Sequence, residues 1–209
     1  MKVDVLVYDG VDELDVVGPF AVFASAGRHV KVKPRLVTLR PQARVKSARG
    51  LRLKPDAYLL EEGKGAKKFA RRTDWPDVIV VPGGGWHDRH AKSGARIEAK
   101  LVELPTFLAI ARRSVPTMVG VGSGVMLLVE GGVIGGRPAT TDTPALEDLA
   151  ASGAQVRTDR VVDDGDLVTC AGFTGGIDLA LWLVEREFGA DLADEVATEL
   201  DYQRWRPSP

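Results

Sequence analysis

Several features are scarce in this 209-residue chain, and each scarcity narrows what the protein can be. There is one cysteine, which excludes a framework of internal disulfides and a zinc site of the Cys-x-x-Cys type. Neither sign of charge is in excess, because 28 Lys and Arg stand against 29 Asp and Glu. We therefore expect neither nucleic acid nor an acidic membrane surface as a partner.

Long hydrophobic runs are also missing, since no stretch approaches the roughly 18 apolar residues that cross a bilayer. The chain opens with Met-Lys-Val-Asp and no apolar signal segment, which predicts a cytoplasmic protein. Hydrophobic residues make up 44% of the chain, enough for a full core, so we expect one globular domain over residues 1–209. The basic run 64–72 is interpreted as a solvated surface.

What the chain does contain, over residues 115–128, is an apolar strand pattern that passes through three alternating glycines into a helical pattern. Gly120, Gly122 and Gly124 allow the backbone to turn sharply and to approach a ligand closely. In α/β enzymes such a strand-to-helix elbow often presents a nucleophile at its tip. Here the tip is Gly122, which has no side chain, and Ser123 follows it.

A second glycine loop, Pro82-Gly83-Gly84-Gly85-Trp86, follows the strand pattern at 77–81. Ligands of open parallel sheets bind beyond the carboxyl ends of the strands, so we expect both glycine loops to face one crevice. Neither loop fits GxGxxG or GxxxxGK[ST], which argues against a dinucleotide or a nucleoside triphosphate. The alternative for residues 83–85 is a simple tight turn.

Elsewhere, strand patterns alternate with helical ones, which predicts a doubly wound, mostly parallel sheet with helices on both faces. The expected strands are 3–8, 32–39, 77–81, 116–121, 155–158, 160–162 and 166–170, with a hairpin at 45–53 and a turn at 163–165. The expected helices run from near Asp15 to Gly27 and over 97–113, 125–130, 144–150, 177–188 and 191–202. Pro19 should lie in a first helical turn, and Pro105 indicates either a break or a late start of its helix. Residues 54–76 should form surface, with room for one short helix.

The order and spacing of these blocks resemble the ThiJ/PfpI superfamily, and within it the isonitrile-hydratase-like branch. The likeness covers nearly the whole chain, and it rests on residues 10–19, 80–84, 124–137, 139–141, 168–172 and 176–181. It implies an α/β, flavodoxin-like fold of the kind shared with class I glutamine amidotransferases. It also implies a homodimer.

Members of this superfamily carry a cysteine at the elbow, usually a histidine after Ala-Thr-Thr, and an acidic residue that touches the cysteine. By this resemblance, the acid corresponds to Asp15, the cysteine to Gly122, the next oxyanion donor to Ser123, the histidine to Asp142, and the oxyanion-side glycines to Gly83 and Gly84. Two of the four reactive positions have changed. The sulfur that the thiolate chemistry of the family requires is therefore absent from this position, and glycine has no side chain that could attack in its place.

Other residues offer alternatives for a displaced nucleophile or base. Cys170 is the only thiol, but it ends a predicted strand, where a buried packing cysteine is the competing interpretation. Ser123 would need a histidine base, and none of His29, His87 and His90 occupies the position that the family uses. His87 follows the glycine loop and is the histidine that could reach the crevice.

Two function classes remain. In the first, the protein binds or senses a small polar metabolite without catalysis, through the glycine loops that contain Gly83, Gly84, Gly85 and Gly124. In the second, a hydratase or hydrolase uses Asp15 to activate water, which requires a raised pKa of Asp15 in a water-poor pocket. A metal held by Asp15, Asp142 and His87 lacks a closely spaced motif such as HExxH, so we expect no metal and no cofactor.

Overall fold

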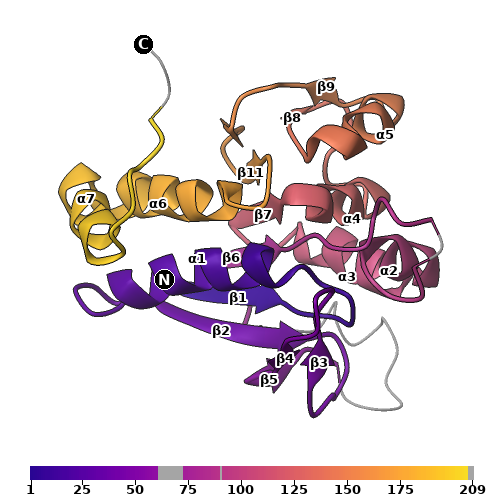
Figure 1. The fold of residues 1–209 in the computed structure, drawn as a ribbon, viewed down its shortest axis with the longest axis horizontal. Coiled ribbons are helices and arrows are strands. Elements are labelled where there is room, and N and C mark those ends of the chain that lie inside the picture. The colour runs from indigo at the N-terminus through magenta and orange to yellow at the C-terminus, as the bar shows by residue number, and fades with distance from the viewer. Residues whose placement is uncertain (61–72, 90, 207–209) are drawn as a thin grey trace.

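The computed structural model describes residues 1–60, 73–89 and 91–206, so the basic run 64–72 and His90 lie outside it. Within this part of the chain, a seven-stranded sheet has the order β10-β11-β7-β6-β1-β2-β5 (Figure 1). Only the pairing of β10 with β11 is antiparallel. The strands are β1 (Lys2–Leu6), β2 (Lys33–Thr38), β5 (Ala57–Tyr58), β6 (Val78–Val81), β7 (Thr117–Val121), β10 (Val161–Asp163) and β11 (Leu167–Cys170).

Helices cover both faces of the sheet, which confirms the predicted flavodoxin-like α/β class. One group packs together as α1 (Glu13–Ala26), α6 (Gly175–Phe188) and α7 (Ala190–Glu199) (Figure 1). The other contains α2 (Ala95–Leu101), α3 (Glu103–Ala111), α4 (Val125–Glu130) and α5 (Leu146–Ala151). Two short pairs lie outside the main sheet, β3 (Val45–Lys46) with β4 (Arg52–Leu53) and β8 (Pro138–Ala139) with β9 (Gln155–Val156).

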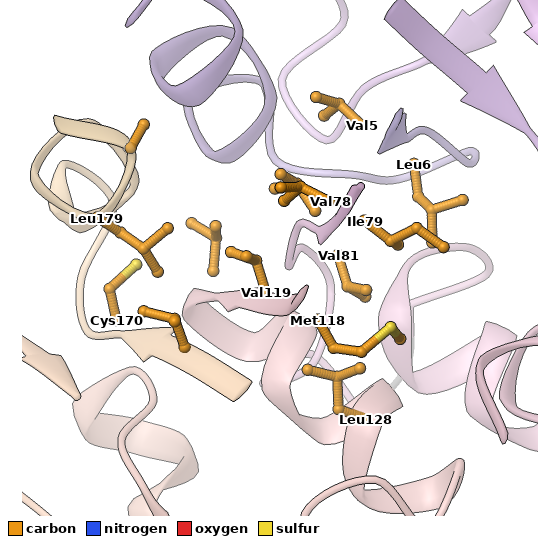
Figure 2. Close-up of a cluster of buried hydrophobic side chains, with 14 of the residues drawn as sticks. Val5, Leu6, Val78, Ile79, Val81, Met118, Val119, Leu128, Cys170 and Leu179 are labelled. Carbon is orange, nitrogen blue, oxygen red and sulfur yellow. The ribbon is translucent and has the colours of Figure 1, made fainter. Parts of the chain in front are cut away.

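The core sits on the central strands, which are buried on both faces and therefore read as continuous apolar runs. Val78, Ile79 and Met118 pack in one buried cluster with Leu128 of the elbow helix α4 (Figure 2). Cys170 is fully buried in the same core, close to Leu179 of α6 in this view (Figure 2). The only thiol is therefore a packing residue of the sheet.

Two helices differ from the predictions at their prolines. The stretch predicted as one helix over 97–113 is two helices that meet at Val102, where φ is 63°, so the predicted break or late start lies three residues before Pro105. Pro105 instead lies in the first turn of α3, where its missing N–H is not needed. Pro19, expected in a first turn, lies inside α1, because Asp12 caps that helix through Leu14 N–H and α1 begins at Glu13, before the predicted start near Asp15.

Smaller differences concern chain ends and a short edge strand. β5 falls in the stretch 54–76, which was predicted as surface with room for one short helix, and α7 ends at Glu199 rather than at residue 202. Among the described residues, no helix is both long enough and apolar enough to cross a membrane.

Candidate functional site at the elbow after β7

The two glycine loops meet at one edge of the sheet, as predicted. β6 and β7 are parallel neighbours, with Val81 opposite Gly120, so their carboxyl ends lie together. Gly84 N–H from the first loop donates to Ser123 Oγ at the elbow, over 3.1 Å. The elbow therefore forms the floor of a site to which α1 and the loop after β8 also contribute.

Asp15 reaches this site from the first turn of α1. Its side chain is 1% exposed, and its Oδ2 accepts a hydrogen bond from Gly83 N–H at 2.9 Å. Burial raises the pKa of Asp15 well above its usual value, and the charges of Asp12 and Asp142 raise it further. Asp15 Oδ1 is buried and has no hydrogen-bond partner among the described residues. The carboxyl group therefore favours its protonated form.

Asp142 comes from the loop after β8 and binds both sides of the elbow. Its Oδ2 accepts from Ser123 N–H at 3.0 Å, and its Oδ1 accepts from Gly172 N–H at 3.1 Å. Burial raises the pKa of Asp142, against the opposing effects of these two N–H groups and of His87. His87 Nε2 lies 3.9 Å from Asp142 Oδ2, and its side chain is 40% exposed.

Gly122 lies beneath these two carboxyl groups. Its φ is +52°, a conformation that residues with a Cβ rarely adopt. A Cβ on Gly122 would lie 2.8 Å from Asp15 Oδ2 and 3.0 Å from each oxygen of Asp142. The sequence predicted a vacant position facing free N–H donors. Instead, carboxyl oxygens fill the space above Gly122 and already bind the N–H groups of Gly83 and Ser123.

Ser123 has a structural hydrogen bond and no visible base. It is 2% exposed, and in the described part of the chain no histidine hydrogen-bonds to it. His29, the other described histidine besides His87, binds Glu199 at 2.8 Å near the end of α7. Ser123 is therefore brought to the site without the activation that a serine nucleophile needs.

The remaining predicted glycines pack tightly against backbone. An added Cβ would lie 2.0 Å from Val81 O at Gly124, 2.4 Å from Asp12 N at Gly84, and 2.8 Å from Ser93 O at Gly85. These distances exclude a side chain at all three positions, which for Gly84 and Gly85 agrees with the tight-turn alternative. Gly83 differs from them, because its Cβ would meet Ser123 Oγ and Asp15 Oδ2 inside the site.

Cys170 lies directly behind the elbow, paired in register with Val121. Burial raises the pKa of Cys170 well above its usual value, and the charges of Asp15 and Asp142 add to this, while Gly122 N–H opposes it. A neutral, buried thiol is a poor nucleophile. In the described residues, no three His, Cys, Asp or Glu side chains are grouped as metal ligands would be.

Sequence reasoning missed two contributors to the site. Asp12 caps α1 and pairs with Arg49, whose guanidinium also stacks over Phe173 at 5.0 Å. An aspartate just before a helical pattern is a recognisable cap signal, so Asp12 could have been found. Gly172 follows β11 and reaches the site only because β11 pairs with β7, which no local pattern reveals.

The sequence profile described as the DJ-1/PfpI family matches residues 1–186. The chain belongs to the DJ-1/PfpI family. It is 32% identical to isonitrile hydratase of Pseudomonas putida over 204 residues, which are 97% of this chain and 78% of that enzyme. A shorter match, 34% over 93 residues, covers 44% of this chain and 28% of the HTH-type transcriptional regulator CdhR of Pseudomonas aeruginosa.

Solved structures of the DJ-1/PfpI type share the fold. A ThiJ/PfpI family protein from Pseudomonas syringae superposes with a TM-score of 0.81 at 26% identity, covering 99% of this chain and 77% of that one. DJ-1 from Schizosaccharomyces pombe superposes with a TM-score of 0.76 at 20% identity, covering 97% of this chain and 100% of that one. At this identity the likeness shows a shared fold only.

Proposed function

We propose that this DJ-1/PfpI protein binds or senses a small polar metabolite at the elbow and does not catalyse a reaction there. The observation that carries the proposal is Gly122, which offers no nucleophile and lies under three carboxyl oxygens within 3.0 Å of its missing Cβ. Covalent catalysis needs an attacking side chain at that place. The partial likeness to the regulator CdhR supports a sensing role.

A second candidate is a hydratase or hydrolase in which Asp15 activates water without a covalent intermediate. It is favoured by the buried Asp15 carboxyl, whose pKa burial raises and whose Oδ1 has no described hydrogen-bond partner. In its ionised form Asp15 would accept a proton from the attacking water as a general base, and a raised pKa makes the carboxylate a stronger base. Asp142 would then be the second carboxyl group of the reaction.

The experiment that separates the two candidates is an isonitrile hydration assay, because isonitrile hydratase is 32% identical to this chain. The purified protein is incubated with alkyl isonitriles, and formation of the N-alkyl formamide is followed. We expect no turnover above the buffer rate. Turnover that disappears in Asp15→Asn would overturn the noncatalytic proposal and establish water activation by Asp15.

Restoring a thiol provides the complementary test. Gly122→Cys places a sulfur at the elbow, provided that the Asp15 and Asp142 carboxyl groups rotate away from the new Cβ. We expect iodoacetamide to label this cysteine before the buried Cys170, which should react rapidly only after unfolding. Fast labelling of native Cys170 in the unaltered protein, together with a measurable activity, would make that residue the displaced nucleophile.

We also propose that the protein is a homodimer. The exposed apolar side chains include Leu14, Val17, Leu51 and Phe173, which are 37–54% exposed, and the guanidinium of Arg49 lies 5.0 Å from the ring of Phe173. Association would remove this apolar area from water. Sedimentation velocity should give a mass of twice 22.5 kDa, and a concentration-independent monomer would reject the dimer.

A further inference from the structure

Two backbone N–H groups from separate loops converge on one carboxylate at the elbow. Ser123 N–H binds Asp142 Oδ2 and Gly172 N–H binds Asp142 Oδ1, at 3.0 and 3.1 Å, so each oxygen receives its own donor. The two donors follow different strands, β7 and β11, which lie side by side in the sheet. This arrangement matches the two oxygens of any free carboxylate, whether or not it is attached to the chain.

A third group faces the same space. Asp15 is 1% exposed, and its Oδ1 has no described hydrogen-bond partner. A Cβ added to Gly122 would lie 2.8 Å from Asp15 Oδ2 and 3.0 Å from each oxygen of Asp142, so the three oxygens border the same space. Burial raises the pKa of Asp15, which shifts this carboxyl toward its neutral form and lessens its repulsion of an anion bound at the elbow.

The position of Asp142 allows its side chain to move away from the elbow N–H groups. Its side chain is 12% exposed, whereas Asp15 is nearly inaccessible, and it belongs to a short loop segment between β8 and the turn Thr143–Ala145. His87, 3.9 Å away and 40% exposed, lies toward solvent and offers a partner for the displaced carboxylate. The Asp142 carboxylate can therefore be displaced from the elbow N–H groups by another acceptor.

We propose that the N–H groups of Ser123 and Gly172 form a binding site for a small free carboxylate, which Asp142 occupies as a built-in substitute until the ligand displaces it. The inference rests on the proposed binding function and names the ligand class: a compact monocarboxylate, bound at both oxygens. Asp142 then sets the affinity by competing with the ligand from within the chain.

Chemical replacement of the Asp142 side chain tests the proposal. Asp142→Gly should unfold at a lower temperature than the unaltered protein, because the buried N–H of Ser123 and the partly buried N–H of Gly172 lose their acceptor. Sodium formate at about 100 mM should then raise the midpoint of Asp142→Gly by roughly 2–5 °C more than sodium chloride does. Formate and acetate should bind this variant at least about tenfold more tightly than they bind the unaltered protein, since the internal competitor is gone.

Asp56→Gly is the matched control, because Asp56 is an exposed aspartate that accepts one backbone N–H, from Leu36 at 2.8 Å. Formate should not distinguish it from chloride. If Asp142→Gly does not fold, Asp142→Asn replaces it in the experiment. The side-chain NH₂ of Asn cannot accept a hydrogen bond, so one of the two backbone N–H donors loses its acceptor, and formate should still stabilise the variant. A formate effect no larger in the Asp142 variants than in Asp56→Gly overturns the carboxylate site. Isonitrile turnover would overturn the noncatalytic proposal and leave this result unaffected.

Discussion

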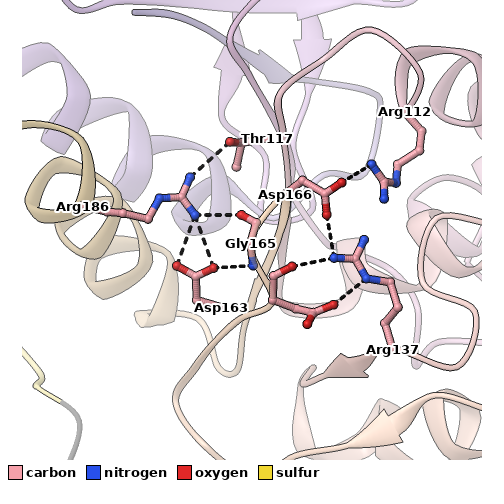
Figure 3. Close-up of polar contacts among 8 residues, drawn as sticks. Arg112, Thr117, Arg137, Asp163, Gly165, Asp166 and Arg186 are labelled. Carbon is pink, nitrogen blue, oxygen red and sulfur yellow. Dashed lines mark hydrogen bonds and ion pairs between the residues drawn. The ribbon is translucent and has the colours of Figure 1, made fainter.

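Aspartates gather at both ends of β7, but the two ends hold them differently. At the amino end, Asp163, Asp164 and Asp166 bind the guanidinium groups of Arg186, Arg137 and Arg112 (Figure 3). At the elbow, Asp15 and Asp142 accept hydrogen bonds from the backbone N–H groups of Gly83, Ser123 and Gly172.

The pKa shifts have opposite directions at the two ends. Hydrogen bonds from Arg137 and Arg112 outweigh the effect of burial and lower the pKa of Asp166, whereas burial raises the pKa of Asp15 and Asp142. Carboxyl groups that are buried without a neighbouring cation do not stabilise the folded chain in their charged form. This contrast is typical of a structural cluster at one end and a binding or reactive cluster at the other.

Gly124→Ala should produce the largest loss of stability, because it disrupts the backbone that positions the elbow carboxyls. The new Cβ would lie 2.0 Å from Val81 O, so β6 and the elbow would have to separate. We expect a loss of about 3 kcal/mol or more in urea unfolding, at the upper end of overpacking effects. Gly136→Ala is the control, since its Cβ has only Gly153 O at 3.9 Å nearby. Similar losses in both variants would contradict tight packing at the elbow.

Arg137→Ala tests the arginine end. Its guanidinium binds Asp164 Oδ2 at 2.5 Å, Asp164 O at 2.6 Å and Asp166 Oδ1 at 2.6 Å, and the side chain is 24% exposed. Losing these charge-assisted hydrogen bonds should lower the free energy of unfolding by about 2 kcal/mol. Arg157→Ala should change it by under about 0.5 kcal/mol, because the pair of Arg157 and Asp159 is 59% and 50% exposed. Equal effects would remove the structural distinction between the two ends.

Gly122→Ala measures the crowding by the elbow carboxyls. Both Gly122 and Gly172 have positive φ, +52° and +72°, but only Gly122 has atoms close to an added Cβ. Gly172→Ala should therefore lose about 1 kcal/mol through backbone strain alone. Gly122→Ala should lose roughly 1 kcal/mol more, as the Asp15 and Asp142 carboxyls shift. Identical losses in thermal or urea unfolding would show that the space above Gly122 is open.

The sequence predicted the scaffold of this site better than its contents. Buried β-branched runs and strand-terminal glycines were sufficient to place β1, β6 and β7 side by side with both glycine loops at one edge. The partners of Asp15 and Asp142 depend on side-chain directions and on the pairing of β11 with β7, which have no local signal. The sequence indicated a break or late start at Pro105, but the break lies three residues earlier at Val102, because a positive φ in a β-branched residue has no local sequence signal.

The smallest expected effect is a difference in pH dependence between the two ends, measured by urea unfolding of Asp15→Asn and Asp166→Asn from about pH 2 to pH 8. The folded-state pKa of Asp15 is raised, so its stabilising contribution is complete below the unfolded value of about 3.9 and is lost as pH rises through the folded value. Asp15→Asn keeps an oxygen for Gly83 N–H and cannot ionise, so its stability relative to the unaltered protein should increase with pH.

The folded-state pKa of Asp166 is lowered, so its contribution is present above about 3.9 and is lost as pH falls through the folded value. Asp166→Asn should therefore be less stable than the unaltered protein near pH 7, and the difference should shrink toward acid. If the two stability differences changed with pH in the same direction, the contrast between aspartates bound by arginine and aspartates bound by backbone N–H groups would be wrong.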